Sequence, residues 1–233
     1  MTATHAAIVI TDEGFFTDGP TVIPATGGGV RTISAFEVAA GGKIVVTTAM
    51  ENADISGVTF DGQAFTPVYS TGNGVQRITT YYLDVVSATT ADILVTPTAG
   101  TTTGIGAVSF TGAALGGPAD FASSATKSSG SFNTENGSLV VGSFTINSAG
   151  TIVPSTASTN LYYEQFIGNG GTTGSSNYYF STVTGTESYG FTSNSSTRPV
   201  AGAVVFNVIP EPSSIALLGL AGLSLVLFSR RRR

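Results

Sequence analysis

The sequence contains no cysteine and only one histidine, His5, among its 233 residues. Without cysteine the chain cannot form disulfides, thiolate metal sites or a cysteine nucleophile. Zinc sites of the usual histidine and cysteine kind lack ligands for the same reason. A Ser-His-Asp triad would depend on His5 alone, and we expect that side chain to be solvated in the N-terminal segment.

Charged residues are also scarce, at 10% of the chain, and the basic ones are unevenly distributed. Four of the nine lysines and arginines end the chain as Arg230, Arg231, Arg232 and Arg233. The residues before Pro210 hold five basic and thirteen acidic side chains. Such an acidic body offers no basic surface for a phosphate backbone, so we expect no nucleic-acid partner.

Glycine and β-branched residues are abundant instead, and this composition favours extended structure over helix. From about residue 30, runs such as KIVVTTA, RITTYYL and ADILVT recur between Gly, Asn and Asp residues. The spacing predicts an all-β protein. Between Phe60 and Phe65, Asp61-Gly62 predicts a tight hairpin, because a two-residue type I′ turn requires positive φ at both central residues.

Three sequence words recur in the same order at offsets of 95, 97 and 96 residues. They are Lys43–Val46 with Ser138–Val141, Tyr81–Leu83 with Tyr178–Phe180, and Gly106–Phe110 with Gly202–Phe206. We infer a duplication with halves at 30–112 and 130–208. The alternative is that β-rich sequences share such words by chance.

Each half has about seven short strands, which could form two small sandwiches or one jelly-roll-like sandwich. Because the linker 116–131 is short and contains apolar residues, we expect a single jelly-roll-like β-sandwich over 30–208, preceded by an N-terminal segment, 1–29. The runs ISGVTFDGQAFTPV and RITTYYLDVVSATTADILVT resemble a β-sandwich module of bacterial exported proteins. That resemblance also implies a jelly-roll fold.

Few residues suggest a metal site or a reaction. Asp12, Glu13 and Asp18 form a weak candidate calcium site, because calcium accepts carboxylate oxygens from irregular loops, but their spacing does not fit an EF-hand. The alternative is a solvated acidic segment. A glycosidase needs only two carboxylates, and the sequence offers four candidates. They are Asp84, Asp92, Glu164 and Glu187. Scattered acids on a sandwich are usually solvated, so we expect no enzyme and no cofactor.

The tyrosines include three adjacent pairs, which are weak candidates for binding a glycan. They are Tyr81-Tyr82, Tyr162-Tyr163 and Tyr178-Tyr179. Neighbours in a strand face opposite sides, so each pair would place one ring inward and one outward. An outward ring could stack on a sugar and still form a hydrogen bond through its hydroxyl. The alternative is ordinary strand packing.

The end of the chain, IPEPSSIALLGLAGLSLVLFSRRRR, differs from everything before it. The uncharged span 213–229 is near the lower length limit for a transmembrane helix. Pro212 can precede the first turn of such a helix without breaking it. The four terminal arginines would stay on the cytoplasmic side of the membrane, which leaves the body outside.

This tail resembles the PEP-CTERM sorting domain of bacterial exported proteins, because Pro210-Glu211-Pro212 precedes a Leu/Gly/Ala-rich span and an arginine cluster. The resemblance implies that an exosortase, a membrane protease-transpeptidase, cleaves near Pro210–Pro212 and that the protein is associated with extracellular polysaccharide and biofilm. The start, MTATHAAIVITDEGFF, does not read as a signal peptide, so we expect a trimmed or incorrect start.

We therefore expect a non-enzymatic exported protein of the cell surface or extracellular matrix, associated with biofilm or exopolysaccharide. Its 209–233 segment would tether it to the membrane and sort it. Its expected partners are the exosortase, the membrane and an extracellular polysaccharide. The alternative is a carbohydrate-binding or adhesive β-sandwich module that is delivered by the same route.

Overall fold

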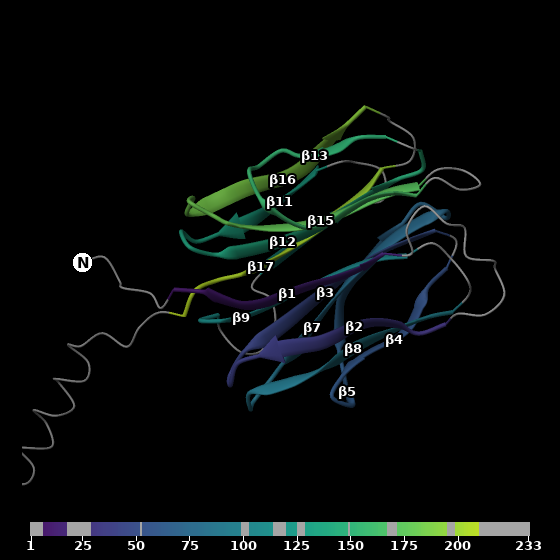
Figure 1. Ribbon diagram of the computed structural model, residues 1–233. Helices are drawn as coiled ribbons and strands as arrows, with labels where there is room; N and C mark the ends of the chain where they lie inside the picture. The colour runs from purple at the N-terminus through teal and green to yellow at the C-terminus, as the bar shows by residue number, and fades with distance from the viewer. Residues whose placement is uncertain are drawn as a thin grey trace, which may run out of the picture.

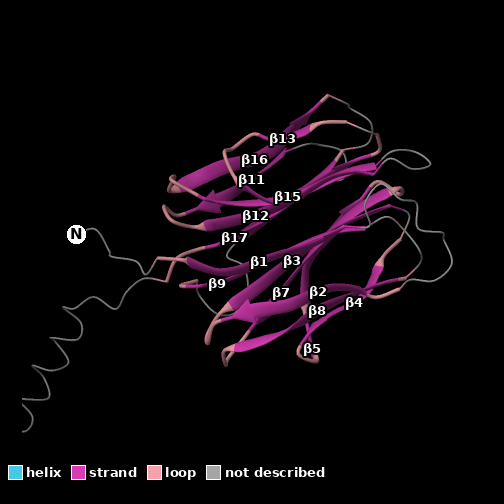
Figure 2. Ribbon diagram, in the orientation of Figure 1, coloured by secondary structure: helices cyan, strands magenta, loops and turns pink. Residues whose placement is uncertain are grey.

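The described residues form four antiparallel β-sheets and no helix (Figure 2). The computed structural model describes residues 7–17, 29–51, 53–98, 103–113, 120–124, 129–148, 150–166, 172–194 and 199–209. The prediction of an all-β protein is therefore confirmed for this part of the chain.

The strands of the first half form two sheets. The larger sheet has the order β1-β9-β3-β7-β6, and the smaller has the order β2-β8-β4-β5. Their bounds are β1 Val9–Thr17, β2 Arg31–Val38, β3 Lys43–Glu51, β4 Ile55–Phe60, β5 Gln63–Ala64, β6 Thr66–Gly72, β7 Gln76–Asp84, β8 Thr89–Pro97 and β9 Thr103–Thr111.

The strands of the second half repeat this arrangement. The larger sheet has the order β10-β17-β12-β15-β14, and the smaller has the order β11-β16-β13. Their bounds are β10 Asp120–Ser124, β11 Ser129–Thr134, β12 Leu139–Ile146, β13 Ile152–Pro154, β14 Thr159–Phe166, β15 Thr172–Phe180, β16 Gly185–Ser193 and β17 Val200–Phe206. The matching strand orders agree with the predicted duplication.

The strand ladders correct the offset between the two halves. Lys43 pairs with Asp84 where β3 meets β7, and Leu139 pairs with Phe180 where β12 meets β15. Equivalent residues on these strands are therefore 96 positions apart. Two of the three offsets read from the sequence, 95 and 97, are each wrong by one residue.

The hairpin predicted at Asp61-Gly62 is confirmed. Phe60 of β4 pairs with Gln63 of β5, which leaves a loop of two residues. Asp61 has a φ of 48° and Gly62 a φ of 72°, so both central residues have the positive φ that a type I′ turn requires.

The four sheets stack as four layers, with the two five-stranded sheets in the middle (Figure 1). One apolar cluster lies between the two sheets of the first half, and another between those of the second. A third cluster lies between the two five-stranded sheets. The structure therefore does not form the single jelly-roll-like sandwich that we expected: each half forms its own sandwich, and the two pack through their inner sheets.

The physical reason for this arrangement is that the central inner strands β12 and β17 are apolar or small on both faces. Every residue of β12 and β17 is buried. A strand of a single sandwich would alternate between buried and exposed side chains, because one face of its sheet meets water. The inner sheets bury both faces because each lies between an outer sheet and the other half.

The first sheet also includes part of the N-terminal segment that we placed outside the sandwich. β1 pairs with β9 from Val9↔Thr111 to Thr17↔Gly104, with a register shift between Ile10 and Asp12. The folded body therefore starts before residue 30, and β1 forms one edge of the five-stranded sheet.

Two tyrosine rings pack against glycines across the contact between the halves. A Cβ atom added to Gly202 in β17 would lie 2.3 Å from the hydroxyl oxygen of Tyr69 in β6. A Cβ added to Gly104 in β9 would lie 2.6 Å from a ring carbon of Tyr162 in β14. Each half therefore receives a ring of the other half at a position where only glycine leaves room.

Hydrogen bonds between buried side chains also join the two inner sheets. The hydroxyls of Thr47 and Ser176 lie 2.6 Å apart. The Thr172 hydroxyl accepts a bond of 3.0 Å from the Gln76 amide and donates one of 3.0 Å to the Glu51 carboxylate. Polar side chains that pair with each other across a contact favour one relative placement of its two sides.

Candidate functional site

The last described residues hold the chain against the body immediately before the predicted sorting motif. Phe206, at the end of β17, packs edge-on against Phe110 of the first half, with ring centroids 5.0 Å apart. Val208 is buried and forms a bridge with Ala113, and the Ile209 amide donates a 3.1 Å hydrogen bond to the Gly112 carbonyl. The body therefore holds the chain up to the residue before Pro210.

The predicted motif itself lies outside the described residues. This applies to Pro210, Glu211 and Pro212, to the expected membrane span 213–229 and to the four arginines Arg230–Arg233. Within the described part of the chain, no helix has the length and apolar character that crossing a membrane requires.

The tyrosine pairs do not present outward rings where their side chains are described. Tyr81, Tyr162, Tyr178 and Tyr179 are buried, and Tyr82 is half-buried. The side chain of Tyr163 is not described. The prediction assumed that one face of each sheet meets water, whereas the central strands of the inner sheets are covered on both faces.

The candidate calcium ligands do not converge. Asp12 accepts a 2.8 Å hydrogen bond from the backbone amide of Glu37, in the outer sheet of its own half. Glu13 instead accepts a hydrogen bond from the Tyr178 hydroxyl of the second half. The two carboxylates point to opposite faces of β1, and Asp18 lies outside the described residues. No group of three or more metal-binding side chains occurs among the residues that the structure describes.

The acids considered as a glycosidase pair lie in separate internal contacts. Asp84 forms an ion pair with Lys43, whose side chain is buried between the halves. Asp92 accepts a 2.9 Å hydrogen bond from the Ala35 amide. Glu187 accepts bonds from the hydroxyls of Ser181, at 2.6 Å, and Tyr179, at 3.0 Å. The side chain of Glu164 is not described.

Sequence reasoning missed a groove between the two sheets of the first half. We call it the open-edge groove, because β6 forms an edge of the inner sheet and β4 and β5 lie at the corresponding edge of the outer sheet. Its volume is about 500 Å³, and its walls come from β4, β6 and β7. A smaller hollow of about 250 Å³ adjoins it and shares Asp54 and Arg77 with it.

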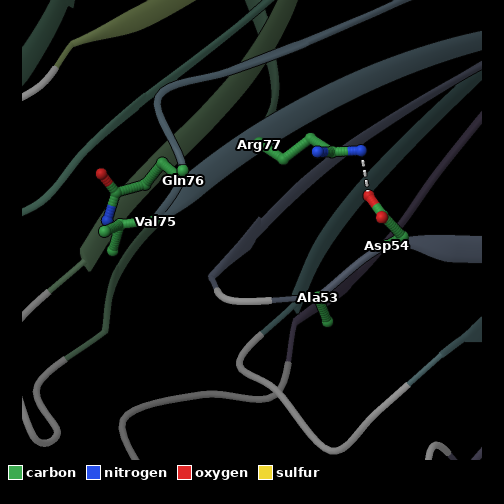
Figure 3. A pocket seen from close by; sticks show the side chains of 6 residues that line it. Ala53, Asp54, Val75, Gln76 and Arg77 are labelled. Carbon is green, nitrogen blue, oxygen red and sulfur yellow. Dashed lines mark ion pairs between the residues drawn. The ribbon is translucent and has the colours of Figure 1, made fainter.

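The groove combines an apolar floor with a polar rim. Val58, Phe65 and Tyr81 are buried lining residues and form the floor. At one end, the Arg77 guanidinium and the Asp54 carboxylate face each other as an ion pair (Figure 3). Their side chains are 44% and 52% exposed, so ligands can reach both charges.

The polar groups of this groove interact through hydrogen bonds and charges. Burial raises the pKa of Tyr81 to about 12, against a smaller opposing effect of a hydrogen bond with Thr79. The Asp54 and Arg77 charges also influence the Tyr81 pKa, in opposite directions. The Thr79 hydroxyl in turn lies 3.0 Å from that of Ser70. No sequence motif marks this set, because its members come from β6, from β7 and from Asp54 just before β4, and these segments meet only in the folded protein.

Comparison with known proteins gives one match, and it falls on the tail. No curated protein and no solved structure matches the chain. Residues 208–233 match the model of the PEP-CTERM protein-sorting motif, as the order of Pro210-Glu211-Pro212, apolar span and arginines predicts. Such a motif implies sorting by an exosortase to the cell surface or beyond. The chain thus carries a PEP-CTERM protein-sorting motif that begins where its β-sheet body ends.

Proposed function

We propose that the protein is a non-enzymatic component of the cell surface or extracellular matrix, which its C-terminal motif first tethers to the membrane. The carrying observation is that the matched motif starts at Val208, the last buried residue of the body. The tethered form would expose Pro210–Pro212 between a rigid domain and the membrane. Two prolines with fixed φ favour an extended chain there, which a membrane protease can bind.

The described acids support a structural rather than a catalytic body. The carboxylates of Asp84, Asp92 and Glu187 each have an internal partner. A glycosidase pair needs two carboxyl groups that face one sugar across a cleft. We therefore propose that the body acts by binding or by forming material, and a glycan turnover that Glu187→Gln abolishes would contradict this.

The sorting proposal is tested on the C-terminus of the full chain, expressed with a signal peptide in a host that has the exosortase. We expect a membrane form that is shortened near Pro210–Pro212. Glu211→Ala should leave the unprocessed form in the membrane, because the apolar span and the arginines still anchor it. Deletion of 213–233 should release an uncleaved body into the medium, since neither the span nor its charged stop remains.

A matched control separates recognition from folding. Glu37→Ala removes an exposed glutamate of the outer sheet and should be processed like the wild type. Mass spectrometry of the C-terminus in strains with and without the exosortase gives the answer. An intact Arg233 in both strains would show that the tail is a plain membrane anchor.

A further inference from the structure

The open-edge groove has the chemistry of a binding site, and nothing in the sorting motif accounts for it. We propose that it binds a neutral sugar unit of a polysaccharide. This inference concerns the body and goes beyond the sorting function, so either can fail without the other.

The floor of the groove suits one face of a sugar ring. Val58, Phe65 and Tyr81 are each less than a tenth exposed, yet all three line the groove. A pyranose has an apolar face of C–H groups, which packs on aromatic and aliphatic side chains. The volume of about 500 Å³ lies within the range of small-molecule sites.

The rim offers both donors and acceptors, as a polyhydroxylated ligand requires. The Arg77 guanidinium donates and the Asp54 carboxylate accepts. The hydroxyls of Ser70 and Thr79, 3.0 Å apart, can do either. A sugar hydroxyl is also both donor and acceptor, so neighbouring hydroxyls of one ring can each find a partner on this rim.

The charges of the rim favour a neutral ligand. Arg77 and Asp54 form an ion pair, and they are the two charged residues that line the groove. An acidic polymer would meet the Asp54 carboxylate as well as the guanidinium. An extended peptide would need to pair with the free edge of β6, where Pro67 lacks an amide hydrogen and the register shifts between Pro67 and Tyr69.

The ion-pair end of the groove lies far from the point where the chain leaves the body. In β3, Lys43 pairs with Phe110 near the chain exit, whereas Glu51, eight residues later, pairs with Gln76 beside the groove. A strand of this length spans roughly 30 Å at about 3.3 Å per residue. When the tail anchors the chain in the membrane, the ion-pair end of the groove faces away from it.

In the second half, the positions equivalent to the groove residues are buried in internal packing. Asn177 replaces Tyr81 and Thr173 replaces Arg77 at the offset of 96 residues, and both are fully buried. The Asn177 amide donates a 2.8 Å bond to the Ser158 hydroxyl and accepts one from the Tyr189 hydroxyl. The polar rim therefore belongs to the first half and is not a general consequence of the fold.

The test is affinity electrophoresis of the full chain in non-ionic detergent. The gels contain dextran, amylopectin or galactomannan as neutral probes, or alginate as an acidic one. We expect at least one neutral polymer to retard the wild type. The double variant Asp54→Asn/Arg77→Gln keeps the net charge and changes only exposed groups, and it should weaken the apparent association about fivefold or more.

A second variant and two controls locate the effect. Tyr81→Phe keeps the ring and removes one hydroxyl, and we expect a loss of about threefold or more. Tyr82→Phe, the next residue on the opposite face of β7, should stay within about twofold of the wild type. Asp92→Asn, an exposed acid of the outer sheet, should do the same.

Several outcomes would overturn the proposal. One is that no neutral polymer retards the wild type, and another is that alginate alone does. A third is equal retardation of the wild type and the double variant, with unchanged far-UV circular dichroism. Competition by a peptide of alternating threonine and valine would assign the groove to strand addition instead. C-terminal processing should be the same in all of these variants.

Discussion

Replacing Gly202 with alanine is expected to weaken the contact between the two sandwiches. The new Cβ would lie 2.3 Å from the Tyr69 hydroxyl oxygen and 2.4 Å from its Cζ, closer than non-bonded atoms approach. The Tyr69 ring has little room to move, because it is 7% exposed and packs with Ile78, Tyr162 and Val200. Overpacking of this kind costs about 1–3 kcal/mol. For a chain of this size the expected decrease in Tm is about 2–12 °C.

Urea unfolding of the full chain, at a fixed detergent concentration, measures this cost. Gly57→Ala is the matched control, because a Cβ at Gly57 meets nothing within 4 Å and its φ is not positive. That variant should be unchanged or more stable by about 0.4–1 kcal/mol. Combining Gly202→Ala with Tyr69→Leu should cost less than the sum of the two single changes. Strictly additive costs, or equal effects of the two glycine variants, would refute the reasoning.

A buried ion pair, two buried tyrosines and one turn glycine also affect the stability of the protein in ways that can be measured. Asp84→Ala should destabilise the protein by about 3 kcal/mol, because the Lys43 charge stays buried without this partner. Lys43→Leu should destabilise it less, because a third of the Asp84 side-chain surface meets water, which can solvate the carboxylate that is left. The pKa values of Tyr69 and Tyr81 are raised to about 12, above the unfolded value near 10. The folded state therefore binds more protons than the unfolded state in this range, so the urea concentration at the unfolding midpoint should decrease as the pH rises from about 10 to about 12. Gly62→Ala should cost about 1–2 kcal/mol, because φ is +72° at a site with open space around it, and the same urea measurement checks this.

Features that depend on neighbouring residues could be predicted from the sequence. The type I′ turn at Asp61-Gly62 requires only two residues that tolerate positive φ between two strands. The repeated strand order could be predicted because equivalent inner strands keep similar words, as in GAVSF of β9 and GAVVF of β17. The small errors in offset arose because such words are short and can be aligned one residue out of place.

The packing of one half on the other could not be predicted in the same way. Alternation of inward and outward residues predicts one outward ring in each tyrosine pair, whereas both Tyr178 and Tyr179 are buried. A signal was present: SLVVGSFTI, which is Ser138 followed by the whole of β12, contains no charged or large polar residue on either face. That pattern is typical of strands that are covered on both sides. No pattern in the sequence indicates the groove, because its existence depends on how the edges of two sheets lie relative to each other in the folded protein.

The contact between the halves also fixes where the chain leaves the described body relative to the groove. The second half carries the exit strand β17, while the open-edge groove belongs to the first half. Phe206 beside the exit packs on Phe110 of the first half, and the Gln76–Thr172 hydrogen bond joins the halves at the opposite end. Contacts at both ends prevent either half from turning independently. A change such as Gly202→Ala, which acts between the halves, should therefore alter how the groove is presented without touching the groove or the sorting motif.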